Sequence, residues 1–220
     1  MSSIFGSFPL FIEYIRIFLV KVFAGKKVLA QVLSLERKCC VMEIVVLRLG
    51  HRLERDKRIT THVGLVGRAL GAKGMLLASE DKGIERSIKE VTKRWGGDFF
   101  VQTGVKWREE LKKWKQEGGK VCHLTMYGEN ILDVIDEIRE EAKNEKARIM
   151  VVVGAEKVPF DVFEVADWNL AVGNQPHSEI AALALFLDYL QQGKELKTKF
   201  EHAEMEIVPK GRGKEVKVKK

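Results

Sequence analysis

Three short segments of the 220-residue chain combine glycine and polar side chains in a way that suits ligand binding. They are LTMYG (124–128), GAEKVP (154–159) and VGNQPHSE (172–179), and each follows a β-rich run. Glycine lets the main chain approach a ligand closely, and neighbouring apolar side chains supply walls for a planar group. These segments predict a small-molecule site in the C-terminal half of the chain.

The basic segment RLGHRLERDKRITTH (48–62) is the other part of the chain whose side chains suggest chemistry. Cations clustered at a strand end can hold phosphate groups, and an ordinary solvated charged loop is the alternative interpretation. The predicted nucleic-acid-binding residues are Arg48, His51, Arg52, Arg55, Lys57 and Arg58.

The elements that must position these segments alternate along the chain. Short β-rich runs (EIVVLR, GMLLAS, DFFVQT, KVCHLTMYG, ARIMVVVG and DWNLAVG) are separated by amphipathic stretches such as ENILDVIDEIREEAK. This alternation predicts an α/β fold, with a parallel sheet covered by helices on both faces. Such sheets bind ligands at the carboxyl ends of their strands, where the three glycine-containing segments would meet.

Charge and composition divide the chain into three parts. Residues 42–193 carry a net charge of −1, whereas residues 1–41 and 194–220 carry +4 each, within a total of +7. The basic ends indicate a polyanionic partner, and solvated lysine-rich tails are the alternative. Residues 1–41 are apolar but interrupted by Glu13, Arg16 and Lys21, so we expect an amphipathic appendage with no stable membrane insertion. A functional chain starting at Met42 is also consistent with the pattern.

Several common site types are missing from the sequence. It contains no GxGxxG and no GxxxxGK[ST] motif, which argues against an ordinary dinucleotide or P-loop site. Cys39, Cys40 and Cys122 form neither a metal-ligand nor a disulfide pattern, so we predict no metal and a reducing, cytoplasmic setting.

Taken together, HRLERDKRITTHVGLVGRALGA, GAEKVP and GNQPHSEIAALA resemble the SPOUT superfamily of RNA methyltransferases, over about Met42 to Lys210. Within it, they are similar to the archaeal tRNA cytidine 2'-O-methyltransferases that act on T-loop position 56. The resemblance implies a C-terminal trefoil knot around S-adenosylmethionine, tRNA as substrate and a homodimer with the active site near its interface. It also implies a methyltransferase domain at 42–193, flanked by the 1–41 appendage and a basic extension at 194–220.

The resemblance assigns roles to individual residues. His62 and Arg68 have the spacing of an Asn and a catalytic Arg in 2'-O-methylating relatives, so Arg68 is the predicted catalytic residue. A guanidinium stays protonated in proteins, so we expect Arg68 to stabilise developing charge rather than to act as a base. Where many relatives have a Ser-Leu-Asn string, this chain has PHSE. The implied cofactor-binding residues are Leu124, Gly154, Ala155, Glu156, Lys157, Val158, Val172, Gly173, Asn174, Gln175, Pro176, His177, Ser178 and Glu179.

Other functions remain open at this level. A nonenzymatic RNA-binding module of the same fold, a related methyltransferase acting on another RNA nucleotide, and a nucleotide-binding α/β enzyme of another class all fit the pattern. Binding of S-adenosylmethionine separates a methyltransferase from the nonenzymatic module and from the other enzyme class.

Overall fold

The computed structural model describes residues 42–144 and 146–219. The predicted appendage at 1–41 lies outside this range. Within it, the elements follow the predicted alternation of strands and helices. In chain order they are β1 (Glu43–Leu49), α3 (Lys57–Ala69), β2 (Gly74–Leu77), α4 (Lys82–Trp95), β3 (Phe100–Thr103), α5 (Trp107–Gln116), β4 (Lys120–Asn130), α6 (Ile131–Ala142), β5 (Arg148–Gly154), α7 (Phe160–Val165), β6 (Trp168–Ala171), α8 (Glu179–Gln191), a 3-10 turn η1 (Glu195–Lys197), β7 (Met205–Ile207) and β8 (Val216–Val218).

The first six strands form one sheet in the order β3-β2-β1-β5-β4-β6, and every neighbouring pair is parallel. The predicted parallel α/β fold is therefore confirmed. Central strands of such sheets are buried on both faces, which explains the nearly continuous apolar runs of β1 and β5. All six strands end at one edge, so the loops that follow them gather there.

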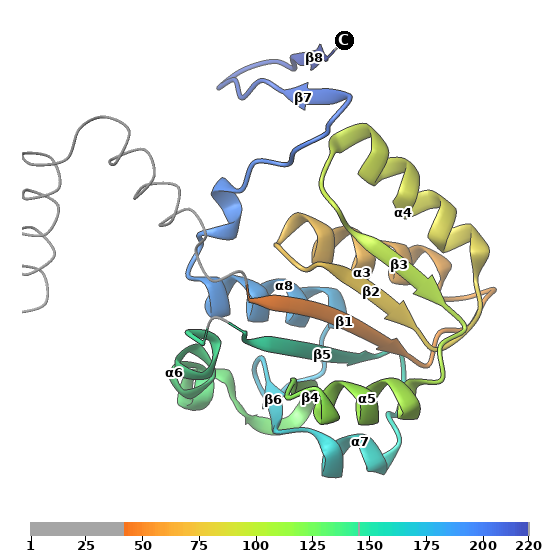
Figure 1. The fold of residues 1–220 in the computed structure, drawn as a ribbon, viewed down its shortest axis with the longest axis vertical. Coiled ribbons are helices and arrows are strands. Elements are labelled where there is room, and N and C mark those ends of the chain that lie inside the picture. Colours follow the sequence, from red (N-terminus) through yellow and green to blue (C-terminus); the bar gives the residue numbers. More distant parts are fainter. Residues whose placement is uncertain (1–41, 145, 220) are drawn as a thin grey trace, which may run out of the picture. The chain divides into compact units, whose positions relative to one another are not determined.

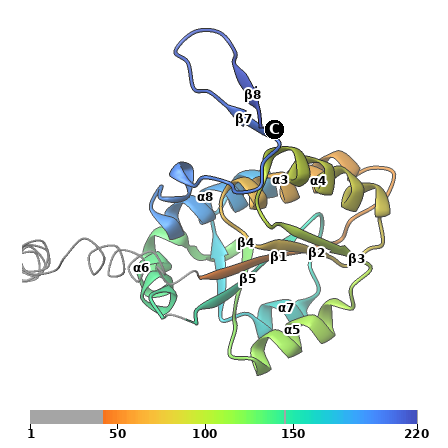
Figure 2. The same ribbon diagram turned by 45° about the horizontal axis from the view of Figure 1, so that its top comes forward.

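Helices cover both faces of this sheet (Figures 1 and 2). Helices α3, α4, α6 and α8 pack on one face, and α5 and α7 pack on the other. Side chains of a strand alternate between faces, so Ile44 and Val46 of β1 join the first core while Val45 and Leu47 join the second. This alternation also decides where Arg48 points.

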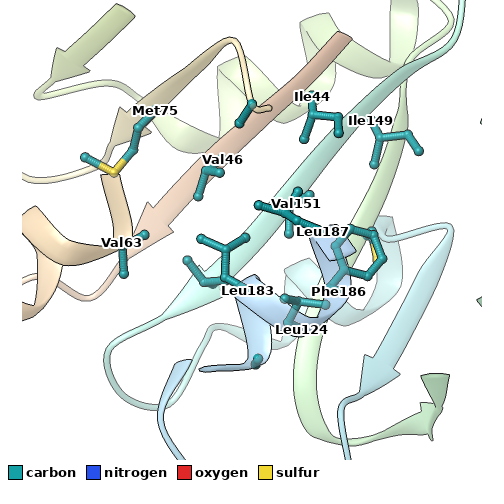
Figure 3. Close-up of a cluster of buried hydrophobic side chains, with 14 of the residues drawn as sticks. Ile44, Val46, Val63, Met75, Leu124, Ile149, Val151, Leu183, Phe186 and Leu187 are labelled. Carbon is teal, nitrogen blue, oxygen red and sulfur yellow. The ribbon is translucent and has the colours of Figure 1, made fainter. Parts of the chain in front are cut away.

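Helix α8 is the largest apolar contribution of the C-terminal region to the core. Ser178 caps its start by accepting a hydrogen bond from the Ile180 backbone N–H, at 3.2 Å. Leu183, Phe186 and Leu187 are fully buried against the sheet (Figure 3).

The chain after α8 continues through η1 into a small antiparallel sheet of β7 and β8. On its way it passes the end of α4, where the Gly97 N–H donates to the Glu201 carbonyl at 2.8 Å. Among the described residues, we find no helix with the length and apolar character needed to cross a membrane.

Candidate cofactor and RNA sites

A cavity of about 530 Å³ lies where β4, β5 and β6 end, and the three glycine-containing segments all contribute to its walls. This volume is in the range of small-molecule sites in proteins. Eleven of the fourteen predicted cofactor-binding residues line it: Leu124, Gly154, Ala155, Glu156, Lys157, Val158, Val172, Gln175, Pro176, His177 and Glu179.

The loop after β5 is packed so closely that Gly154 has no room for a side chain. A Cβ atom there would overlap the Val158 side chain and lie 3.0 Å from the Glu156 carbonyl oxygen. The Ala155 N–H donates to the Leu49 carbonyl at 2.9 Å, which ties this loop to the end of β1. The main chain at Gly154 and Ala155 therefore forms a fixed wall of the cavity.

The loop after β6 is braced by its own polar side chains. The Asn174 amide donates to the carbonyls of Met126 (3.1 Å) and Gly128 (3.0 Å), and the His177 ring N–H donates to the Val172 carbonyl at 2.7 Å. Three predicted cofactor-binding residues do not line the cavity. Asn174 clamps the loop, Ser178 caps α8, and Gly173 supplies a backbone turn with φ +75° in open space.

The cavity also includes side chains outside the list of implied cofactor-binding residues. His123 is the most informative, because its Nδ1 is 2.9 Å from the Asn169 side-chain oxygen and its ring packs edge-on against Phe163. Burial lowers the pKa of His123 below its ordinary value, against the opposing effect of the Asn169 hydrogen bond. The additional lining residues are His123, Thr125, Met126, Tyr127, Phe163 and Ala182.

Some of these additions carry a local signal in the sequence. Thr125, Met126 and Tyr127 belong to the LTMYG segment, and Met126 is a natural apolar wall. Phe163 lies on α7, a six-residue helix, and Ala182 lies one turn into α8. Nothing local marks Phe163 or Ala182, because their position at the cavity depends on how distant elements pack.

Part of the basic segment remains available to a polyanion. Arg55, Lys57 and Arg58 are exposed at the start of α3, and no ion pair joins them to another side chain in the described part of the chain. Arg52 behaves differently, because it pairs with Asp56 at 2.9 Å and with Glu156 at 3.4 Å. The Arg52 hydrogen bond is the main reason that the pKa of Asp56 falls to about 2.

Two residues of the basic segment are inside the protein, which corrects their prediction as surface phosphate ligands. Arg48 is fully buried and pairs with Glu179 at 2.7 Å. His51 is buried between Thr60, 2.9 Å from its Nδ1, and Asp81, 3.2 Å from its Nε2. His51 is covered by α3 and by the residue that caps α4, whereas Arg48 lies against the start of α8.

The predicted catalytic residue, Arg68, does not lie at the cavity of its own chain. It sits in the last turn of α3, beside the edge where the strands begin, whereas the cavity lies where they end. Its guanidinium donates to the Gly96 carbonyl at 2.5 Å and stacks over the Phe200 ring at 4.7 Å. Burial lowers its pKa, and these contacts are those of a residue that joins α3, α4 and the C-terminal segment.

Comparison with known proteins begins with the fold. A protein of Porphyromonas gingivalis assigned to the TrmH family of RNA methyltransferases matches with TM-score 0.51 and 13% identity, over 69% of this chain and 60% of that one. A protein of Bordetella pertussis Tohama I assigned as a methyltransferase matches with TM-score 0.51 and 14% identity, over 71% of this chain and 97% of that one. The chain therefore has the fold seen in TrmH-type methyltransferases.

Sequence comparison defines the family. The profile of the family described as "tRNA ribose 2'-O-methyltransferase, aTrm56" matches residues 95–217. A protein of Methanococcoides burtonii is 60% identical over 80% of this chain and 96% of its own length, and one of Methanocella arvoryzae is 56% identical over 80% and 98%. Both are named tRNA (cytidine(56)-2'-O)-methyltransferase. The chain belongs to this family of tRNA ribose 2'-O-methyltransferases.

Proposed function

We propose that this chain methylates the ribose 2'-hydroxyl of cytidine 56 in tRNA, with S-adenosylmethionine as methyl donor. The observation that carries the proposal is the cavity at the ends of β4, β5 and β6, in a chain of the tRNA ribose 2'-O-methyltransferase family. Relatives named for action on cytidine 56 share more than half of their residues with it.

The residues of the cavity fit S-adenosylmethionine. Leu124, Val158 and Val172 give apolar walls that suit an adenine ring, and the close-packed main chain at Gly154 offers backbone donors and acceptors. Glu156 and Glu179 bring carboxylates that suit the cationic groups of this molecule. When bound, S-adenosylmethionine supplies an activated methyl group on its sulfonium.

The protein's own contribution to the reaction is alignment and charge. Methyl transfer is an in-line displacement that requires the 2'-hydroxyl to be held in one orientation. Arg55, Lys57 and Arg58 lie at the same edge of the sheet as the cavity, at the end of the loop after β1 and in the first turn of α3, and Arg52 of this loop pairs with Glu156. Their exposed cations can hold phosphates on either side of the target ribose and so orient it over the cavity.

The same family implies a larger architecture, which we also propose. The C-terminal segment forms a trefoil knot, supported by the hydrogen bonds from Asn174 to the Met126 and Gly128 carbonyls of β4 and by the deep burial of α8. The chain forms a homodimer, supported by exposed apolar side chains on α6 and α8 and beside the cavity: Leu132, Leu185, Tyr189, Met126 and Tyr127. Residues 42–193 make up the methyltransferase domain.

Methyl transfer to a defined tRNA tests the function directly. We expect a tritium-labelled methyl group from S-adenosylmethionine to appear on an unmodified tRNA transcript and to be absent when the nucleotide at position 56 carries a 2'-deoxyribose. Binding of tRNA without any transfer would instead support a nonenzymatic RNA-binding module. Transfer that persists with 2'-deoxycytidine at position 56 would identify another target nucleotide.

A further inference from the structure

Arg48 is an unusual residue for its place in the fold. All the remaining residues from Ile44 to Leu49 are apolar and buried. Arg48 is the charged residue of this run, and it is 0% exposed as well. Its Nη2 donates to Glu179 Oε1 at 2.7 Å, and its Nε and Nη1 have no hydrogen-bond partner among the described residues. A guanidinium with most of its donors unused is therefore buried beside a single carboxylate.

Such a pair is a poor means of stabilising a fold. Removing the Arg48 guanidinium from water opposes folding, and a well-packed apolar side chain in the same place is often equally or more stable. Because the neighbouring positions of β1 already carry isoleucine, valine and leucine, an apolar residue at position 48 would suit the core. The presence of arginine there points to a role other than packing.

Glu179 connects this buried charge to the cavity. It is the first residue of α8, its side chain is 25% exposed, and it lines the cavity. One carboxylate oxygen is held by Arg48, so the other is available to the cavity side. A glutamate side chain normally samples many rotamers, and a buried partner removes that freedom. The start of a helix also favours a negative charge at this position.

The other charges around Arg48 lie on the loop after β1 and on the loop after β5. Asp56 is close enough that the positive charge of Arg48 helps to lower its pKa, although Asp56 is bonded to Arg52. Arg52 in turn reaches Glu156, whose side chain is more exposed than that of Glu179. Of the two carboxylates that line the cavity, Glu179 is thus the one with a buried partner.

We propose that Arg48 is a positioning residue that fixes the Glu179 carboxylate at the cavity wall, where Glu179 favours the cationic methyl donor over the neutral product. This inference rests on the proposed function, since it concerns the same cofactor. Methyl transfer forms a C–O bond and breaks the C–S bond, the 2'-hydroxyl loses its proton to water, and the electron pair of the broken bond stays on sulfur, so the sulfonium becomes an uncharged thioether. A fixed carboxylate attracts the first form more than the second, which speeds product release.

Binding measurements on the full chain test the proposal without relying on turnover. Calorimetry gives the dissociation constants of S-adenosylmethionine and S-adenosylhomocysteine, and their ratio is compared among variants. We expect Glu179→Gln to reduce the preference for the sulfonium about tenfold, a change that corresponds to the loss of one charge interaction. Arg48→Met should reduce it to a similar extent, and Arg48→Lys should keep part of it.

The double variant Arg48→Met/Glu179→Gln distinguishes a role of Arg48 in positioning Glu179 from a role in the stability of the fold. If Arg48 acts through Glu179, the double variant has the same ratio as Glu179→Gln alone, because the effects are not additive. Arg148→Met is the matched control, since Arg148 pairs with Glu43 and Glu117 at the opposite edge of the sheet. Loss of the Arg148 ion pairs should change the melting temperature and leave the ratio of the two dissociation constants unchanged.

Each outcome decides the proposal. An unchanged ratio in Glu179→Gln overturns the role of Glu179, and an unchanged ratio in folded Arg48→Met or Arg48→Lys shows that Arg48 only stabilises the fold. If Arg48→Met does not fold, the ratio in Arg48→Lys decides between the two roles. Failure of the parent chain to bind S-adenosylmethionine contradicts the proposed function itself. A parent that binds it but leaves cytidine 56 unmethylated contradicts only the substrate, and the ratio still tests Arg48.

Discussion

The loop after β6 and the loop after β1 border the same edge of the sheet but are held by different forces. Uncharged hydrogen bonds from Asn174 and His177 to carbonyl groups fix the first. Ion pairs of Arg52 with Asp56 and Glu156 fix the second, next to cations that have no such partner among the described residues. Salt screens exposed charges but hardly affects neutral hydrogen bonds, so cofactor binding should tolerate salt and RNA binding should not.

Removal of residues 178–220 is the most severe test of the loop after β6. Without α8 the cavity loses Glu179 and Ala182, and the sheet loses the apolar cover of Leu183 and Phe186. We expect cofactor binding to be undetectable by calorimetry and the proposed dimer to be absent in sedimentation experiments. A shortened chain that still binds S-adenosylmethionine would show that α8 is not part of the site.

Replacing Arg55, Lys57 and Arg58 together by alanine tests the loop after β1. We expect tRNA affinity to fall and the slope of log affinity against log salt concentration to decrease by about two to three, because up to three phosphate contacts are lost. Cofactor affinity should not change. Alanine at the exposed Lys112 and Lys113 on α5 is the control, and an equal decrease per removed charge there would mean that binding follows total charge only.

Substitutions of two glycines distinguish two reasons for glycine in the cavity loops. One reason is lack of space for a side chain, and the other is a backbone conformation with positive φ. At Gly154 an added methyl group collides with Val158, so Gly154→Ala should move the wall and weaken cofactor binding about tenfold. At Gly173 the space is open and only the positive φ opposes a side chain, so Gly173→Ala should cost about 1 kcal/mol or more in stability and affect affinity less. The reverse order, measured by calorimetry, would place Gly173 at the cofactor.

Arg68→Ala tests whether Arg68, in the last turn of α3, takes part in catalysis or only stabilises the fold. Because Arg68 bonds to the Gly96 carbonyl and stacks on Phe200, we expect a loss of about 1 to 3 kcal/mol in the free energy of unfolding. Turnover per folded enzyme should be nearly unchanged, as measured by methyl transfer alongside urea denaturation. A hundredfold loss of turnover at intact stability would identify Arg68 as the catalytic residue.

The smallest expected effect concerns His123, a titratable residue in the wall of the cavity. Its folded-state pKa is depressed by burial, so the unfolded chain takes up this proton first as the pH falls. His123 therefore makes its full contribution to the free energy of unfolding above its unfolded-state pKa of 6.5. This contribution is lost as the pH falls through the lower folded-state pKa. We expect His123→Gln to flatten the dependence of stability on pH below 6.5. An unaltered pH dependence would mean that His123 is not buried as a neutral ring.

Much of the cavity lining was predictable because its signal is local. Gly154 and the residues around it form a loop whose function depends on the main chain, and a glycine flanked by a buried strand identifies such a loop directly. Asn174 and Ser178 do not line the cavity, for reasons of one kind. Both lie in the correct loop, but one braces it and the other caps α8, and this difference depends on which partner each side chain meets.

The sequence by itself determined the alternation of strands and helices, the parallel sheet and the three loops at its carboxyl edge, because these follow from short-range patterns of apolar residues and glycine. Only the tertiary structure decided which cations are buried and which are exposed. Arg48 and Arg58 lie close together and look alike in the sequence, yet one is fully buried and the other exposed. Arg48 points to the face of β1 that carries Ile44 and Val46, and α8, from 131 positions further along the chain, supplies the carboxylate that pairs with it. Burial and pairing of a charge are set by contacts between distant segments, and no local pattern encodes them.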